Sequence, residues 1–501
     1  FVDVPENELG RGLISHPAVD RVVLTGAFET AALFRSWRPD LPLLAETSGK
    51  NAMIITPTAD LDLAARDLVR SAFGHAGQKC SAASLAILVG PVARSRRFAR
   101  QLVDATHSLR IGMPEDPRSD VGPLIEPPTG KLEWALTTLD EGERWLVRPH
   151  AVDAERRLWA PGIRTGVEPG SRFHREEFFG PVLGIMRARS LEHAIELQNA
   201  VDFGLTAGLY TQNPADLQRW LQAVEAGNLY VNRGITGAIV RRQPFGGWKR
   251  SSVGAGTKAG GPNYLVGLGS WRASVSGARS ASLHLRGLDS RLTGVIEAAQ
   301  ASLDYEAFEW VRRAALSDAI SWDKEFGQVR DVSRLGVERN LFRYRPVPVA
   351  VRATGDADWR AVLRVVLAGV RARSRFSLSS PVRLPAPVRR VLSELDVDVR
   401  VETDGEWIER MSAGTTDSLT AVDGLSEPRP PRARLVGSRR AVESLRTALA
   451  EGTAGDPDLA VYAGEVTTAA RLELLPFLRE QSISITAHRF GTPDPWSEAV
   501  I

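Results

Sequence analysis

The sequence contains a single cysteine, Cys80, among 501 residues. Intramolecular disulfides and metal sites built from several cysteines are therefore excluded. The eight histidines are scattered without ligand spacing, so we predict no metal site. Neither a Gly-x-Ser-x-Gly turn nor a His-Glu-x-x-His helix occurs, so nothing indicates a serine hydrolase or a zinc protease of these types.

Long apolar runs and a strong charge excess are also missing. No run approaches the roughly 20 residues of a membrane span, and residues 1–8 lack the order of a signal peptide. We therefore expect a cytoplasmic protein without a membrane span. Lys and Arg total 63 against 60 Asp and Glu, a net charge of +3, which is too small to predict nucleic acid as a partner.

Strand and helix patterns alternate along the chain. A buried strand at 21–26 precedes a helix at 28–37, and a strand at 51–56 precedes a helix that Asp60 can cap. This alternation predicts an α/β fold with a parallel sheet. The same pattern resumes after a composition shift near residue 270. The strands expected there lie near 347–352, 375–378, 397–401, 433–436, 459–462 and 482–486.

Two residues could carry chemistry. Cys80 follows two glycines in FGHAGQKCS, which predicts an exposed turn, although a lone cysteine is by default an inert core residue. Glu46 ends the apolar strand in LLAETSGKN, where a carboxylate can act as a general base or simply pair with a cation or a helix end. Together they supply the nucleophile and the base that oxidation through a thioester requires.

Several motifs, in fixed order, resemble those of the aldehyde dehydrogenases. They are LTG at 24–26, the Glu46 turn with Lys50, GHAGQKCSA at 74–82, EEFFGPV at 176–182, NLYVNRG at 228–234 and PFGGWKRS at 244–251. The resemblance covers roughly residues 1–270. It implies the aldehyde dehydrogenase fold, with a partial Rossmann-type NAD domain and an α/β catalytic domain, followed by a second α/β Rossmann-like domain.

Within this family the sequence resembles the L-glutamate γ-semialdehyde (Δ1-pyrroline-5-carboxylate) dehydrogenases of bifunctional proline utilisation A proteins. The likeness lies in ETSGKNA, GITGAIVRRQPFGG and TKAGGPNYL, and ITAHRFGTP at 485–493 is similar to their C-terminal domain. The resemblance implies NAD-dependent oxidation of the semialdehyde to glutamate, the second step of proline catabolism.

The resemblance also implies residue roles. Cys80 would attack the aldehyde, and Glu46 would activate the water that hydrolyses the thioester. The residues expected at NAD are Thr25, Gly26, Ala27, Glu177 and Phe179, with Ala27 where the family usually has serine. The residues expected at the substrate are Ser81, Gly237, Ala238 and Phe245. A plain glycine loop is the alternative for the last set.

We predict a remnant of the NAD-binding domain at 1–52, to which 246–270 return, and a catalytic domain at 53–245. A linker at 271–280 and a C-terminal aldehyde-dehydrogenase-like domain without catalytic residues at 281–501 would follow. The family's early Pro-Trp-Asn and Lys-Pro segments do not occur before Leu24, so we expect an N-terminally truncated chain. A proline dehydrogenase domain, upstream or on a partner, and further copies of this chain are the expected partners.

Two other functions remain open from the sequence. The chain could oxidise a different semialdehyde by the same mechanism, or it could be a non-catalytic assembly or channel-covering fragment. The C-terminal domain could cover the active-site region and a channel for the intermediate, or serve stability and assembly.

Overall fold

The computed structural model describes residues 1–5, 7–272, 288–414 and 429–501. They form two compact units, each assembled from separate stretches of the chain. Unit 1 comprises Phe1–Glu46, Val253–Val329 and Arg343–Glu480, and unit 2 comprises Thr47–Ser252, Arg330–Phe342 and Gln481–Ile501. Most of the predicted linker, from residue 273 onward, lies outside the described residues. The predicted domain ranges remain a prediction.

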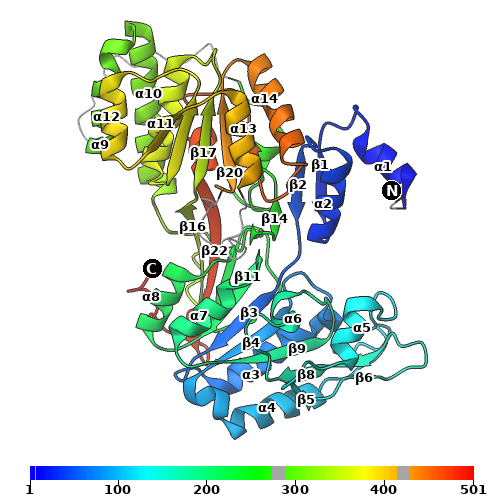
Figure 1. Ribbon diagram of the computed structural model, residues 1–501. Coiled ribbons are helices and arrows are strands. Elements are labelled where there is room, and N and C mark those ends of the chain that lie inside the picture. The colour runs from blue at the N-terminus through cyan, green and yellow to red at the C-terminus, as the bar shows by residue number, and fades with distance from the viewer. Residues whose placement is uncertain (6, 273–287, 415–428) are drawn as a thin grey trace. The chain divides into compact units, whose positions relative to one another are not determined.

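Unit 2 is built on the large sheet, which has ten strands (Figure 1). In spatial order they are β15 (Arg330–Asp331), β16 (Glu338–Pro346), β22 (Leu478–Thr486), β12 (Asn228–Val231), β11 (Thr206–Tyr210), β3 (Asn51–Ile55), β4 (Ala83–Val89), β9 (Val182–Ala188), β8 (Gly162–Thr165) and β5 (Arg144–Val147). All neighbours from β22 to β8 are parallel, as predicted. The outermost pairs, β15 with β16 and β8 with β5, are antiparallel, so the sheet is mixed rather than wholly parallel.

Helices connect these parallel strands. They are α3 (Leu61–Phe73), α4 (Arg96–His107), α5 (Gly130–Thr137), α6 (Arg172–Arg175), α7 (Leu191–Asn199) and α8 (Pro214–Ala223). The Asp60 carboxylate accepts a 3.2 Å hydrogen bond from the Leu63 amide, so it caps α3 as predicted. Because parallel crossovers are right-handed, α3, which leads from β3 to β4, lies on the opposite face from α7, which leads back from β9 to β11.

Short strands pair in twos beside the large sheet. They are β6 (His150–Ala151) with β7 (Trp159–Ala160), β10 (Phe203–Gly204) with β13 (Trp248–Lys249), and β23 (His488–Arg489) with β24 (Thr492–Pro493).

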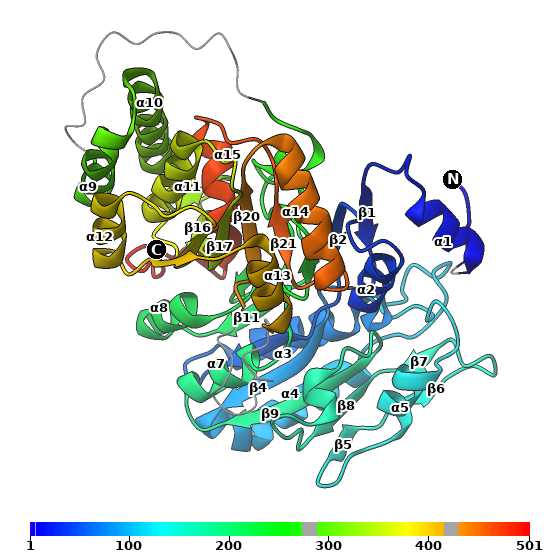
Figure 2. The ribbon, with the colours of Figure 1, turned by 45° about the horizontal axis from the view of Figure 1, so that its top comes forward.

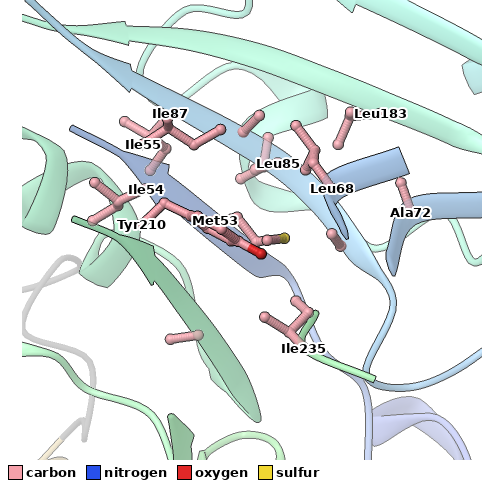
Figure 3. Packing of buried hydrophobic residues seen from close by; sticks show 14 of the residues in the cluster. Met53, Ile54, Ile55, Leu68, Ala72, Leu85, Ile87, Leu183, Tyr210 and Ile235 are labelled. Carbon is pink, nitrogen blue, oxygen red and sulfur yellow. The ribbon is translucent and has the colours of Figure 1, made fainter. Parts of the chain in front are cut away.

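The core of unit 2 surrounds its central strand (Figure 3). Every residue of β3 is buried, as expected for a parallel strand covered on both faces. Met53 and Ile54 are fully buried and pack in one cluster with Leu68 of α3 and Leu85 of β4. This rigid sheet positions the turns at its strand ends, where the candidate residues lie.

One predicted strand belongs to a different sheet than expected. The sequence pattern predicts the strand near 482–486 as part of the C-terminal α/β domain, but Ser482, Ser484 and Ile485 of β22 pair with β12 of the large sheet. This strand is red beside the green strands in Figure 1. The sequence shows only a short apolar run at this position, and such a run does not specify its neighbour.

The first part of unit 1 is a small sheet of β1 (Val22–Thr25), β2 (Leu43–Glu46) and β14 (Ser252–Val253), accompanied by α1 (Glu8–Ser15) and α2 (Phe28–Trp37). Leu41, Leu43 and Val253 are buried at its core. Strands β1 and β2 are parallel, with Thr25 paired to Glu46. The carboxyl ends of both strands therefore lie side by side.

The second part of unit 1 contains a five-stranded parallel sheet, in the order β19 (Asp398–Val401), β18 (Phe376–Ser380), β17 (Val349–Ala353), β20 (Arg432–Val436) and β21 (Ala460–Tyr462). The order 3-2-1-4-5 is the Rossmann strand order without its sixth strand, and it confirms the predicted second α/β sheet. Its helices are α9 (Ser290–Ala299), α10 (Tyr305–Ser321), α11 (Trp359–Arg371), α12 (Ala386–Glu394), α13 (Asp404–Ala413), α14 (Arg439–Gly452) and α15 (Ala470–Leu474). Helices α9 to α12 lie on one side and α13 with α14 on the other (Figure 2).

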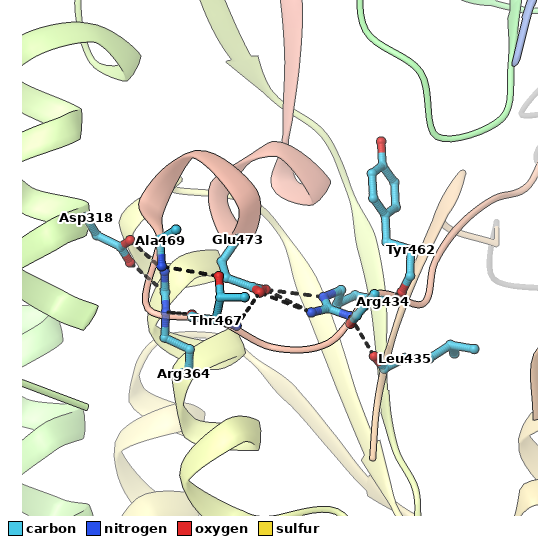
Figure 4. A network of polar contacts seen from close by, with 9 residues as sticks. Asp318, Arg364, Arg434, Leu435, Tyr462, Thr467, Ala469 and Glu473 are labelled. Carbon is cyan, nitrogen blue, oxygen red and sulfur yellow. Dashed lines mark hydrogen bonds and ion pairs between the residues drawn. The ribbon is translucent and has the colours of Figure 1, made fainter. Parts of the chain in front are cut away.

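Buried ion pairs join the helices and strands of this second part (Figure 4). Arg364 of α11 makes two 2.8 Å hydrogen bonds to the Asp318 carboxylate, and both side chains are almost completely buried. Arg364 also donates to the Thr467 carbonyl at 3.0 Å, and the Thr467 amide donates to Glu473 at 2.9 Å. Glu473 pairs with Arg434 at 3.0 Å. Burial raises the pKa of Asp318 to about 6 despite the attraction of Arg364.

Replacing one member of this buried pair should strongly destabilise unit 1. In Arg364→Leu the Asp318 carboxylate is left buried without its partner, and the expected loss in the free energy of unfolding is about 3–5 kcal/mol. The double variant Arg364→Leu/Asp318→Leu should recover most of this loss, because neither charge is then buried. Urea unfolding followed by circular dichroism measures both.

Arg360→Leu is the matched control on the same helix. Arg360 pairs with Asp358, but their side chains are 43% and 55% exposed, so water screens the pair. Its effect should be a small fraction of that of Arg364→Leu. Equal effects of the two substitutions would show that burial of the Arg364 pair is unimportant.

Candidate active site

Cys80 lies in a tight turn between α3 and β4. The turn begins with a short 3₁₀ segment, Gly74–Gly77, in which Gly77 has φ +67° and a Cβ would lie 2.2 Å from the Gly180 carbonyl oxygen. The Ala82 amide then closes the turn by donating to the Lys79 carbonyl at 2.8 Å. Cys80 lies outside every helix and strand, as the glycines predicted, but it is half-buried rather than exposed.

Asn51 fastens this turn to the sheet. Its Nδ2 donates to the Cys80 carbonyl at 2.7 Å and to the Ala82 carbonyl at 2.9 Å, while its Oδ1 accepts from the Thr206 amide at 2.9 Å. A Cβ at Gly49 would lie 2.7 Å from the Cys80 carbonyl oxygen, so only glycine fits there. Sequence reasoning missed Asn51, because its partners are distant in the chain.

Glu177 approaches the same segment from a loop. One carboxylate oxygen accepts a 2.9 Å hydrogen bond from the Gly49 amide. Burial raises the pKa of Glu177, and the hydrogen bond from Gly49 opposes that shift. Phe179, two residues later, has φ +54° and is 37% exposed. Both residues expected at NAD in unit 2 therefore lie on one loop.

Lys50 is a buried cation that sequence reasoning noted only as part of a motif. It is 3% exposed, and its Nζ finds no hydrogen-bond partner among the described residues. Nζ lies 4.2 Å from the centroid of the Phe173 ring and 5.0 Å from that of Phe178. Burial lowers the pKa of Lys50 to about 7, although the charge of Glu177 acts in the opposite direction.

Unit 1 brings together the other candidates. The Gly26 amide donates to the Glu46 carbonyl at 3.2 Å, so the Thr25-Gly26-Ala27 turn lies beside the end of β2. Lys258 was not predicted as a site residue. It is 3% exposed, and burial lowers its pKa to about 8 against the charges of Glu46 and Glu480. Glu46 therefore lies within the electrostatic reach of a buried lysine.

Of the four residues expected at the substrate, Ser81 lies in the Cys80 turn and the other three lie on a separate loop. Ser81 is 4% exposed and its carbonyl accepts from Thr206 Oγ1 at 3.4 Å. Gly237 lines a cavity of about 1400 Å³ together with Lys79, the residue before Cys80. Ala238 is exposed on the same loop as Gly237, and Phe245 is half-buried at its end.

Comparison with known proteins assigns the family. The model of the aldehyde dehydrogenase family matches residues 1–267. The chain belongs to the aldehyde dehydrogenase family. The fold that the sequence motifs predicted is thereby confirmed. Among the described residues, no helix has the length and apolar character needed to cross a bilayer.

Two curated relatives share one name. The chain is similar to 1-pyrroline-5-carboxylate dehydrogenase of Bacillus subtilis, with 38% identity over 277 residues, or 52% of this chain and 51% of the relative. The enzyme of that name from Geobacillus kaustophilus is 37% identical over 277 residues, with the same two shares of 52% and 51%. The chain therefore spans about half the length of these curated relatives.

A solved structure extends the likeness into the C-terminal part. Proline utilization A (PutA) from Corynebacterium freiburgense is 43% identical, with a TM-score of 0.76, and the match covers 97% of this chain and 44% of that one. The predicted resemblance to proline utilisation A proteins is confirmed.

The burial of Lys50 predicts a pH-dependent stability. Because folding lowers its pKa from 10.5 to about 7, the unfolded chain binds the extra proton between these two values. Burying Lys50 therefore destabilises the folded protein, and this penalty decreases as the pH rises through that window. Lys50→Met should be more stable than wild type near pH 7, and the difference should shrink by up to about 1.4 kcal/mol per pH unit toward pH 9.

Urea unfolding at several pH values measures this difference. Lys324→Met, which removes an exposed lysine that is not among the charges acting on Lys50, is the control and should differ from wild type by the same amount at each pH. A difference between Lys50→Met and wild type that does not vary with pH would contradict the buried, proton-releasing state of Lys50.

Proposed function

We propose that this aldehyde dehydrogenase oxidises L-glutamate γ-semialdehyde to L-glutamate with NAD. The observation that carries the proposal is the Cys80 turn, which is fastened by Asn51 and adjoins the cavity at Lys79. The names of the relatives support the choice of substrate.

Cys80 acts as the nucleophile. Its thiolate forms a bond to the aldehyde carbon, and the carbonyl oxygen becomes an oxyanion to which the Cys80 amide donates, by analogy with the family. Loss of hydride from that carbon leaves a thioester on Cys80. Glu46 then takes a proton from water, the resulting hydroxide adds to the thioester, and the Cys80 thiolate leaves as glutamate forms.

NAD would supply the hydride acceptor, and the local chemistry fits it. Helix α2 begins after Ala27 without any side-chain cap, which leaves its start suited to a pyrophosphate. The Gly49 amide orients the Glu177 carboxylate, a group that can accept hydrogen bonds from a ribose diol. Thr25, Gly26 and Phe179 complete the proposed cofactor set, in which Ala27 provides no hydroxyl.

The substrate's own carboxylate requires an anion-binding group. We assign this role to Ser81 and to the backbone amides of Gly237 and Ala238, with Phe245 beside the aliphatic chain. Gly237 has φ +81°, a conformation that favours glycine and allows successive amides to point at an anion.

The proposal also covers the binding partners of the chain and its division into domains. A proline dehydrogenase domain, upstream or on a partner chain, would supply the intermediate, and a homo-oligomer is expected. The domain ranges are 1–52, 53–245 and 281–501, with residues 330–342 and 481–501 of the last range built into unit 2. A catalytic thiol must stay reduced, which fits the cytoplasm.

Cys80→Ser should lower the dehydrogenase activity by at least about 1000-fold, because a serine hydroxyl is far less ionised than a thiol. NADH formation at 340 nm measures the rate, and the unfolding temperature checks that the fold is kept. A Cys80→Ser variant that retains activity while folded would remove Cys80 from the mechanism.

Glu46→Gln should slow deacylation more than hydride transfer, because an amide cannot take the proton from water. We expect a burst of about one equivalent of NADH followed by slow turnover. Stopped-flow absorbance resolves the two phases. If burst and steady state slow by the same factor, Glu46 does not act as the deacylation base.

A further inference from the structure

A buried glutamine closes the loop that carries Gly237 and Ala238. Gln243 is 3% exposed, and its Oε1 accepts a 2.9 Å hydrogen bond from the Ile239 amide. The backbone N–H of Gln243 donates in return to the Ile239 carbonyl at 2.9 Å. Residues 239–243 are therefore held as one closed turn, directly after the exposed loop apex.

The other end of the Gln243 side chain binds strands from far along the chain. Its Nε2 donates to Asn340 Oδ1 at 2.5 Å and lies 3.2 Å from both Glu338 Oε1 and Ser484 Oγ. Glu338 and Asn340 belong to β16, and Ser484 belongs to β22. Asn340 and Ser484 are 0% and 1% exposed, so water does not compete for these hydrogen bonds.

The start of the loop is bound to the same group. Arg233 Nη1 donates to Ser484 Oγ at 2.7 Å and forms an ion pair of 2.7 Å with Glu338. Ser484 Oγ donates in turn to Asn340 Oδ1 at 2.9 Å. We call Arg233, Gln243, Glu338, Asn340 and Ser484 the loop clamp.

Between its two bound ends the loop is open. Gly237, Ala238 and Ile239 are exposed, and a Cβ at Gly237 would meet no atom within 4 Å. Arg233 and Gly237 line the same cavity as Lys79. The apex is therefore accessible to a ligand in that cavity, while its position depends on the clamp.

We propose that the loop clamp determines substrate specificity by holding the Gly237 and Ala238 amides in position for the carboxylate of the aldehyde substrate. The inference rests on the proposed function and gives residues 330–342 and 481–486 a role in it. Two amides bind one carboxylate well only at a fixed separation, and an unclamped loop must be ordered at each binding event. A misplacement of about 1 Å can cost up to about 100-fold.

Ser484→Ala tests the clamp without touching the loop's own backbone partners. It removes the hydroxyl that joins Arg233 to Asn340 and leaves β22 in register. We expect faster hydrogen exchange of the amides at 235–243, measured by mass spectrometry on the full chain. We also expect KM for glutamate γ-semialdehyde to rise roughly 10- to 100-fold. The kcat for that substrate, and both constants for propanal, should stay within about threefold, since propanal has no carboxylate.

Ser497→Ala is the matched control. Ser497 is also fully buried, and its hydroxyl accepts from Arg339 at 3.1 Å, outside the clamp. It should change neither loop exchange nor the ratio of the two KM values. Gln243→Leu, which keeps the volume and removes the amide, should reproduce Ser484→Ala.

The outcomes separate this inference from the function it rests on. If wild type shows no preference for the semialdehyde over propanal, the proposed substrate is wrong. If wild type shows the preference but the Ser484→Ala and Gln243→Leu variants keep it with unchanged loop exchange, the clamp is not a specificity determinant. Equal losses on both aldehydes would also overturn it, because they indicate general damage.

Discussion

The pairing of β22 with β12 is the constraint on which the rest of unit 2 depends. It adds a strand from near the end of the chain to the sheet whose first strand in the sequence begins at Asn51. Beyond β22 lie β16 and then the edge strand β15. Backbone pairing with β12 fixes the register of β22. In this register the Ser482 and Ser484 side chains reach the loop that follows β12. Ser482 Oγ then donates to the Pro244 carbonyl at 2.6 Å, and Ser484 joins the loop clamp. The candidate substrate loop is thus positioned by residues more than two hundred positions away.

Buried ionisable groups are the second feature of this chain. Asp318 and Arg364 satisfy each other within unit 1 and have a structural role. Lys50 differs, because its ammonium group is buried against aromatic rings next to the loop that holds Glu177. Lys258 is buried within the electrostatic reach of Glu46. Such shifted groups concentrate where proton transfer and charge recognition occur, which agrees with the proposed chemistry at both candidate regions.

The sequence predicted local features well. The turn at Cys80, the strand end at Glu46 and the cap at Asp60 all follow from residue types within a few positions of each other. The parallel pairing of the five-stranded sheet and of the central strands of the ten-stranded sheet follows from strand-helix alternation. The motif resemblance identified the family, which composition and periodicity alone could not do.

The sequence could not predict features that depend on pairing across long distances. The sequence of a short apolar strand such as β22 does not indicate which strand it pairs with. The sequence pattern did not predict β16 as a strand. Asn51 and Gln243 are ordinary polar residues in the sequence, and their importance comes from partners at Cys80, Asn340 and Ser484. The two units are each assembled from separate stretches of the chain for the same reason, because segments far apart in the sequence pair with each other.

Peptide mapping by mass spectrometry tests the central claim most directly. The Glu46→Gln chain would be mixed with NAD and glutamate γ-semialdehyde, quenched in acid and digested. The account predicts a γ-glutamyl group attached to the peptide that contains Cys80, formed only when NAD is present. A chain that produces NADH without this adduct, or that carries the adduct on another residue, would contradict it.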